Sequence, residues 1–188
     1  MKNKSILVFL FLFLIGIIAC KKKFDPEEFE SKRINTADSL VRIAYSKYES
    51  KDFNGAYRLC NEAILSCPGF SRATVLMGKM KLEDEEYSKA IELFTIAINN
   101  QGIMQHYEVE EVYQKRAFAK ESLNDYRGAL ADYNILTESF NSKYAYYHRG
   151  ILKYNFLDDA NGACSDWSVA GEKGDNRAYD LIDKFCNN

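Results

Sequence analysis

The chain has 188 residues, of which 47% are hydrophobic and 14% aromatic, and its formal net charge is −2. Ten glycines and two prolines are too few for a collagenous or low-complexity chain, and so many aromatic residues at so small a net charge exclude wholesale disorder. Acidic and basic side chains nearly balance, so the composition indicates a folded protein that does not bind nucleic acid.

The first residues have the pattern of an export signal. Lys2 and Lys4 precede an unbroken apolar run from Ile6 to Ala19, and Cys20 follows directly. A basic start, 14 apolar residues and a small residue before the cleavage point describe a secretory signal peptide, whereas a spanning helix needs about 20 apolar residues. The sequence therefore predicts that residues 1–19 are removed. The alternative is an uncleaved helix with an incidental cysteine.

The end of this run, Ile17-Ile18-Ala19-Cys20, resembles the bacterial lipobox. An aliphatic residue stands three positions before the cysteine and a small residue just before it. In that family the cysteine is acylated and becomes the first residue of the mature protein, so the resemblance implies a lipid anchor at Cys20. The next residue is Lys21, not the aspartate that favours retention in the inner membrane. The resemblance thus points to the outer membrane of a bacterial envelope, with the face of that membrane left open.

Residues 20–35 are charged, contain Pro26 and show no sustained hydrophobic periodicity. We predict that they form the lipidated N-terminus and a tether, with at most a frayed start of the first helix. The folded domain is expected over residues 36–188.

The rest of the chain repeats itself. Four similar segments carry alanines at nearly regular intervals, at Ala56, Ala90, Ala129 and Ala163. Four residues after these alanines stand Cys60, Phe94, Tyr133 and Trp167. Three residues further on, another small or apolar residue completes the pattern. This i, i+4, i+7 spacing describes one face of a helix that recurs four times.

A repeat period of about 34 residues with this pattern resembles the tetratricopeptide repeat (TPR), a helix–turn–helix unit. The resemblance covers about residues 37–172 and implies an all-α, right-handed TPR-type α-solenoid of about four repeats. The repeats are expected at about residues 37–70, 71–104, 110–143 and 143–172. The alternative is a four-helix bundle whose amphipathic helices match this pattern by chance.

Two irregularities and an end cap are also expected. Five extra residues between the second and third repeats, around Asn99 to Val109, predict a longer loop or an extended helix start. One extra residue is expected in the turn between the helices of the fourth repeat. A final helix at about residues 175–186, capped by Asp175, is predicted to cover the apolar end of the last repeat.

Motifs for catalysis or metal binding are missing from the sequence. The two histidines, His106 and His148, are far apart along the chain, and there is no P-loop, dinucleotide-binding glycine pattern, zinc-hydrolase motif or nucleophile elbow. Residues 159–162 approach a calcium loop but lack its first ligand and its final glutamate. We therefore expect no enzymatic activity, no cofactor and no bound metal.

Four cysteines remain besides Cys20. Cys60 and Cys67 would lie ~10.5 Å apart within one helix, which is too far for a disulfide. An antiparallel pairing of the last two helices would bring Cys164 and Cys186 side by side. The sequence leaves open whether these two form a disulfide or all four are buried thiols.

In the TPR family the first helix of each repeat lines a concave groove. Carrying the family's groove positions over to this sequence implies these candidate partner-binding residues: Tyr45, Tyr48, Arg72, Lys79, Gln114, Phe118 and Tyr147. Three of them, Tyr45, Lys79 and Phe118, share one repeat position and are predicted to form a ladder along the groove. For each tyrosine, packing between helices is the alternative. The chaperone-binding carboxylate clamp is not expected, because Val41 and Tyr45 replace the lysine and asparagine that it needs.

These features favour a non-catalytic, lipid-anchored envelope protein that binds a protein or peptide through a concave TPR groove. An accessory subunit of an outer-membrane or envelope assembly machine is the second hypothesis. An envelope hydrolase is the third.

Overall fold

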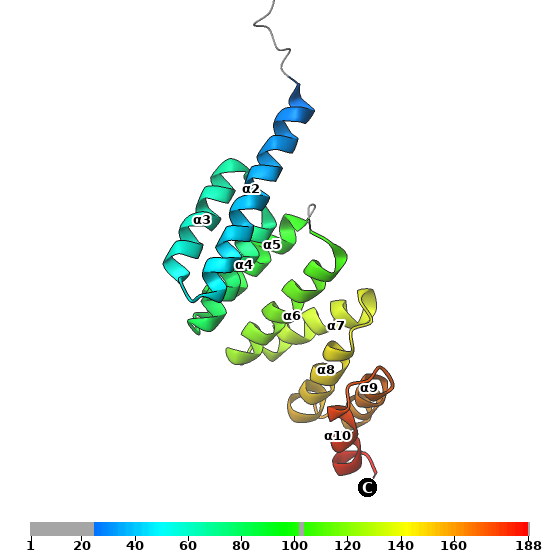
Figure 1. Ribbon diagram of the computed structural model, residues 1–188. Helices are drawn as coiled ribbons and strands as arrows, with labels where there is room; N and C mark the ends of the chain where they lie inside the picture. The colour runs from blue at the N-terminus through cyan, green and yellow to red at the C-terminus, as the bar shows by residue number, and fades with distance from the viewer. Residues whose placement is uncertain (1–24, 102–103, 188) are drawn as a thin grey trace, which may run out of the picture.

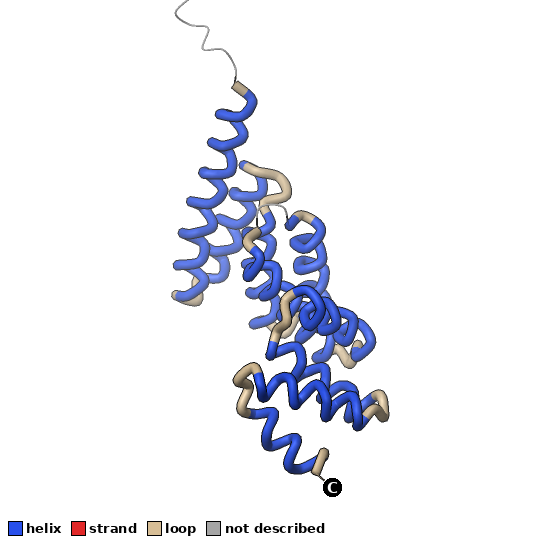
Figure 2. Tube along the Cα trace, turned by 90° about the vertical axis from the view of Figure 1, so that its right-hand side faces the viewer, coloured by secondary structure: helices blue, strands red, loops and turns tan. Residues whose placement is uncertain are grey.

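The computed structural model describes residues 25–101 and 104–187, and these residues form helices joined by short turns (Figures 1 and 2). In chain order the helices are α2 (Pro26–Glu49), α3 (Phe53–Ser66), α4 (Ser71–Glu83), α5 (Tyr87–Asn99), α6 (His106–Ser122), α7 (Tyr126–Ser139), α8 (Lys143–Phe156), α9 (Ala160–Glu172) and α10 (Arg177–Phe185). No helix in this part of the chain is both long and apolar enough to cross a bilayer.

The helices stack in chain order as four hairpins followed by α10. Figure 1 shows the colours running in sequence from the blue end at α2 to the red end at α10. The hairpins are α2–α3, α4–α5, α6–α7 and α8–α9, and each packs on the next. The result is an elongated all-α solenoid in which every hairpin contacts mainly its neighbours.

The turn inside each hairpin has the same construction. Three residues separate the two helices, and the middle one has a positive φ: 63° at Lys51, 57° at Glu85, 60° at Asn124 and 53° at Asp158. In three of the turns an aspartate then caps the second helix by accepting a backbone N–H three residues later, at 2.8–2.9 Å. Asp159 is one of these caps, so the stretch that approaches a calcium loop is a helix start.

Small residues on the first helix of a hairpin face large ones on the second. A Cβ atom added to Gly78 would lie 2.6 Å from Cε1 of Phe94, and one added to Gly150 would lie 2.5 Å from Nε1 of Trp167. Phe94 and Trp167 are both buried, as is Tyr133 at the same repeat position. The predicted stripe therefore lies in the core, because close helix approach places a small residue of the first helix opposite each of these large side chains.

The structure corrects the predicted tether over residues 26–35, which are helical. Asp25 caps α2 by accepting the N–H groups of Glu27 and Glu28 at 2.9 and 3.3 Å, and Pro26 occupies the first helical position. The two glutamates also lie where the positive end of the helix dipole favours them. A strong N-terminal cap thus starts the helix where the apolar pattern alone shows no periodicity.

Both expected irregularities are located by the structure. α6 has 17 residues against 13 in α4, because its start is extended by a turn, and the connector before it is longer as well. In the fourth hairpin the extra residue lies in the last turn of α8, not in the three-residue turn itself. Accordingly, the Asp159 N–H bonds to the Lys153 carbonyl, whereas the Asp125 N–H bonds to the carbonyl of Lys120, one residue nearer in sequence.

The C-terminal end is closed by α10. Ala178 is buried against α9, while Leu181, Ile182 and Phe185 are partly buried beside Trp167. Asn176 occupies the N-cap position without a side-chain bond, and Asp175 instead accepts the Arg177 N–H at 3.3 Å. A disulfide joins Cys164 to Cys186, with Cα atoms 5.8 Å apart, and the free Cys60 and Cys67 are buried.

Candidate partner-binding groove

The first helices of successive hairpins are connected by polar pairs on one face. Arg72 of α4 donates to Asp38 of α2 at 2.9 Å and to both carboxylate oxygens of Glu108 of α6 at 2.8 and 3.1 Å. One guanidinium thus connects three helices. Both carboxylates raise the pKa of Arg72, with the hydrogen bond to Glu108 as the largest cause. Arg72 is therefore already bound within the protein.

Tyr45, Lys79 and Glu111 form a second connection along the same face. The Lys79 ammonium lies 5.5 Å from the centre of the Tyr45 ring and 2.7 Å from the Glu111 carboxylate. Only 14% of the Lys79 side chain is exposed. Burial raises the pKa of Tyr45. This part of the predicted ladder is a packed cation–aromatic pair.

At the turn end of this face, the Tyr48 hydroxyl donates to Glu83, and Lys51 donates to the same carboxylate at 2.5 Å. These hydrogen bonds lower the pKa of Glu83, with Lys51 as the largest cause and the charge of Lys115 as a smaller one. The Tyr48 ring also packs in a tilted arrangement against the Phe53 ring, with 5.8 Å between ring centres. Tyr48 is consequently tied to its own neighbours.

A hollow of about 310 Å³ opens between α4, α6 and α8. It is lined by Leu82, Glu83, Gln114, Lys115, Phe118 and Tyr144. Phe118 is 44% exposed, although its ring approaches that of Tyr87 at 6.4 Å. Leu82, Phe118 and Tyr144 give the hollow an apolar wall, and Glu83, Gln114 and Lys115 give it polar groups. Pockets with this mixture can bind an apolar side chain and orient its polar neighbours.

The predicted groove residues thus occupy three different settings. Gln114 and Phe118 line the hollow. Tyr45, Tyr48, Arg72 and Lys79 are engaged in pairs within the protein, as described above. Tyr147 lies beneath the Arg177 guanidinium of α10, which is 4.2 Å from its ring centre. The ladder of Tyr45, Lys79 and Phe118 does not form one open surface, because the first two members pack against each other. Cys20 lies outside the described residues.

Lys115 is a lining residue that the transferred groove positions omit. It directly follows Gln114 on α6, so the adjacent position in the repeat is the only signal for it in the sequence.

Two buried ionic clusters were not predicted from the sequence. Asp132, only 1% exposed, binds Arg116 and Lys120, and Asp166 binds Arg149 and Lys153 in the same way one repeat later. Recurrence of Arg, Lys and Asp with nearly the repeat period is the signal that reveals them. These clusters are structural and lie within the third and fourth hairpins.

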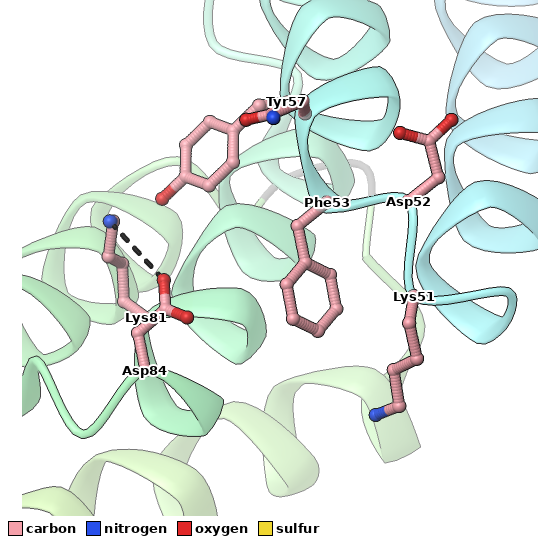
Figure 3. Close-up of a pocket in the computed structure, with 7 residues that line it drawn as sticks. Lys51, Asp52, Phe53, Tyr57, Lys81 and Asp84 are labelled. Atoms are coloured by element: carbon pink, nitrogen blue, oxygen red, sulfur yellow. Dashed lines mark ion pairs between the residues drawn. The ribbon is translucent and has the colours of Figure 1, made fainter.

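A larger and more open hollow, about 550 Å³, lies at the turns of the first two hairpins (Figure 3). It is lined by Lys51, Asp52, Phe53, Asn54, Tyr57, Lys81 and Asp84. Lys81 lies 3.6 Å from Asp84, 2.6 Å from Glu86 and 5.2 Å from the centre of the Tyr57 ring. The charged side chains that line this hollow are paired with one another or with neighbouring residues, so it offers a partner fewer unpaired groups than the hollow beside Phe118. Within residues 25–101 and 104–187, no group of metal-ligating side chains is assembled.

Comparison with known proteins identifies the fold. No family model and no curated protein matches the sequence. Among solved structures, the crystal structure of MamA matches with a TM-score of 0.63 and 16% identity, over 77% of this chain and 82% of that one. YrrB, described as a TPR protein with an unusual peptide-binding site, matches with a TM-score of 0.61 and 16% identity, over 72% and 67%. The N-terminal domain of stress-induced protein-1 (STI-1) from C. elegans gives 0.59 and 14%, over 64% and 97%. The predicted all-α TPR solenoid is confirmed.

Proposed function

We propose that the protein binds a partner protein, through an extended segment or a helix, in the groove formed by α4, α6 and α8, without catalysing a reaction. The observation that carries this proposal is the hollow beside Phe118. A large aromatic ring that stays 44% exposed in a concave wall has apolar surface for a partner to cover. The TPR fold supports the same function, and YrrB is described as having a peptide-binding site.

The remainder of the groove is suited to act as a preorganised support. Arg72 and Lys79 are held by carboxylates from neighbouring helices, which fixes the spacing of α2, α4 and α6. A rigid surface loses little conformational entropy when a partner binds. The paired residues therefore position the hollow, while Gln114, Lys115 and Phe118 contact the partner.

The proposal includes a lipid anchor at Cys20 in a bacterial envelope, on the outer membrane. Its support is the lipobox-like end of the N-terminal apolar run. Only the short segment 21–25 separates Cys20 from Pro26, and a chain of that length can span at most ~20 Å. The start of α2 is at one end of the solenoid (Figure 1), so an anchor there leaves the groove side of α4, α6 and α8 further from the bilayer.

Site-specific photocrosslinking in the native cell tests the groove. A photoreactive residue at Gln114 is expected to trap one defined partner, and Phe118→Ala in the same chain should abolish that product. Glu92, exposed on α5, is the matched control position. Equal crosslinking from Glu92, or an unchanged product in the Phe118→Ala chain, would show that partners bind elsewhere.

The anchor is tested separately by Cys20→Ser. This variant is expected to lose fatty-acid labelling and to leave the membrane fraction. Retention of both properties would refute the lipid anchor without affecting the proposal for the groove.

A further inference from the structure

A triad of a tyrosine ring, a basic side chain and a carboxylate recurs along this protein. Lys79 lies over Tyr45 and pairs with Glu111, and Arg177 lies over Tyr147 and pairs with Asp175. The same arrangement occurs in these further sets: Tyr48–Lys51–Glu83, Tyr57–Lys81–Glu86, Tyr113–Arg116–Asp132 and Tyr146–Arg149–Asp166. In each set the ring face and the carboxylate together hold the cation.

In the groove, Tyr144 and Glu121 lie close together, but no basic side chain of the described residues pairs with this carboxylate. Gln114, Phe118 and Glu121 are spaced i, i+4 and i+7 on α6, so Glu121 continues the face that lines the hollow. Glu121 is partly buried beside Tyr133 and Tyr144, and burial raises its pKa. No base pairs with Glu121 in the part of the chain that the structure describes.

Among the residues that the structure describes, those around Glu121 supply no compensating charge. Tyr144 and His148 pack at 4.2 Å between ring centres, and Tyr133 and His148 at 5.8 Å. Burial, together with the charge of Arg177, lowers the pKa of His148 to about 4, so this imidazole is neutral at pH 7. Arg177, the base that acts on Tyr144, is itself held by Asp175 at 2.6 Å.

A second observation also indicates an unfilled site. The Tyr133 side chain is fully buried, and its hydroxyl has no hydrogen-bond partner among the described residues. This hydroxyl lies near both Tyr144 and Glu121 without meeting the geometry of a hydrogen bond to either. A buried polar group without a partner is uncommon and destabilising. A ligand group that bound Glu121 could also give the Tyr133 hydroxyl a hydrogen-bond partner, either directly or by reorienting the Glu121 carboxylate.

We infer that Glu121, with the rings of Tyr144 and Phe118, binds an arginine or lysine side chain of the partner segment, next to an apolar side chain that enters the hollow beside Leu82. This inference rests on the proposed function of the groove. Lys115 does not oppose it, because Lys115 and Lys51 both act on the Glu83 carboxylate. The incoming cation would complete, on the concave face, a triad with Tyr144 and Glu121 for which residues 25–101 and 104–187 supply no basic side chain.

A peptide array tests this inference with the full chain in detergent. The probes are immobilised hexapeptides in which one position carries Arg, Lys, Gln or Glu and the next position carries Phe, Leu or Ala. Peptides with Arg or Lys before Phe or Leu are expected to bind at least ~tenfold better than those with Glu. Glu121→Gln should remove this preference, whereas Glu92→Gln on α5 should retain it.

The two proposals fail differently in this experiment. If neutral and basic peptides bind equally and Phe118→Ala abolishes both, the groove function stands and the role of Glu121 is refuted. If Glu-containing peptides bind best, Lys115 governs recognition and the inference is wrong. If no basic peptide binds the wild-type chain, the inference is also wrong, and crosslinking from Gln114 decides the groove function independently. Circular dichroism of each variant checks that the helices are retained.

Discussion

Removal of the Asp132 carboxylate is expected to destabilise the third hairpin severely. Asp132 is 1% exposed and accepts hydrogen bonds from Arg116 Nε and Nη2 at 3.0 and 2.6 Å and from Lys120 Nζ at 2.8 Å. The two basic side chains are themselves only 13% and 15% exposed. Asp132→Ala would therefore leave two poorly hydrated cations of α6 without their common anion on α7.

The magnitude follows from the cost of an uncompensated buried charge. Removing one partner of a buried ion pair costs about 3–5 kcal/mol, because the remaining charge keeps its desolvation penalty and loses its attraction. For a domain of this size, one kcal/mol corresponds to about 2–4 °C in the melting midpoint. Asp132→Ala is thus expected to lower the midpoint by roughly 6–20 °C. Glu92→Ala, at an exposed position of α5, should change it little.

The second hairpin has uncharged side chains at the corresponding positions of this site. In the second hairpin, Met77 and Leu93 occupy the places that Arg116 and Asp132 hold in the third. The double variant Arg116→Met with Asp132→Leu removes the carboxylate together with one of its two cations and leaves only Lys120 without its anion, so it should recover part of the stability lost in Asp132→Ala. Thermal and urea unfolding followed by circular dichroism measure all three variants. A loss below about 1 kcal/mol for Asp132→Ala, or a double variant as unstable as the single one, would refute this reasoning.

Three further predictions concern other parts of the solenoid. Phe118→Ala should weaken partner binding about tenfold or more while changing folding stability by under about 1 kcal/mol. Tyr45→Ala, which removes a ring packed on the core formed by α2, α3 and α4, should instead cost about 1–3 kcal/mol in urea unfolding. Reduction of the Cys164–Cys186 disulfide opens a loop of 22 residues and should lower stability by about 3 kcal/mol, and a Cys164→Ser chain should melt identically with and without reductant. The pKa of His148 is about 4 in the folded protein against 6.5 ordinarily, so the unfolded chain binds an extra proton between these pH values. Stability should therefore fall as the pH drops from 6.5 to 4. His148→Gln should flatten this dependence, and an unchanged pH profile of stability in that variant would contradict the prediction.

Much of the fold is predictable from the sequence because its determinants are local. Ala90, Phe94 and their counterparts recur with the repeat period, and each stripe defines a helix face without reference to the rest of the chain. The close approach of Gly78 to Phe94 follows from that stripe. The start of α2 was mispredicted for an equally local reason, because the cap formed by Asp25 and Pro26 outweighs the missing apolar pattern.

The settings of the groove residues were decided by tertiary structure. Tyr45 and Phe118 hold the same repeat position, and periodicity cannot distinguish them. Lys79 and Glu111 enclose Tyr45, whereas Phe118 opens on a hollow between three helices. Periodicity in the sequence predicts the helices, their pairing and the core, since these depend on residues within one repeat. The stacking of neighbouring repeats determined which side chains are engaged and which remain available, because long polar side chains choose partners on other helices that no periodic pattern specifies.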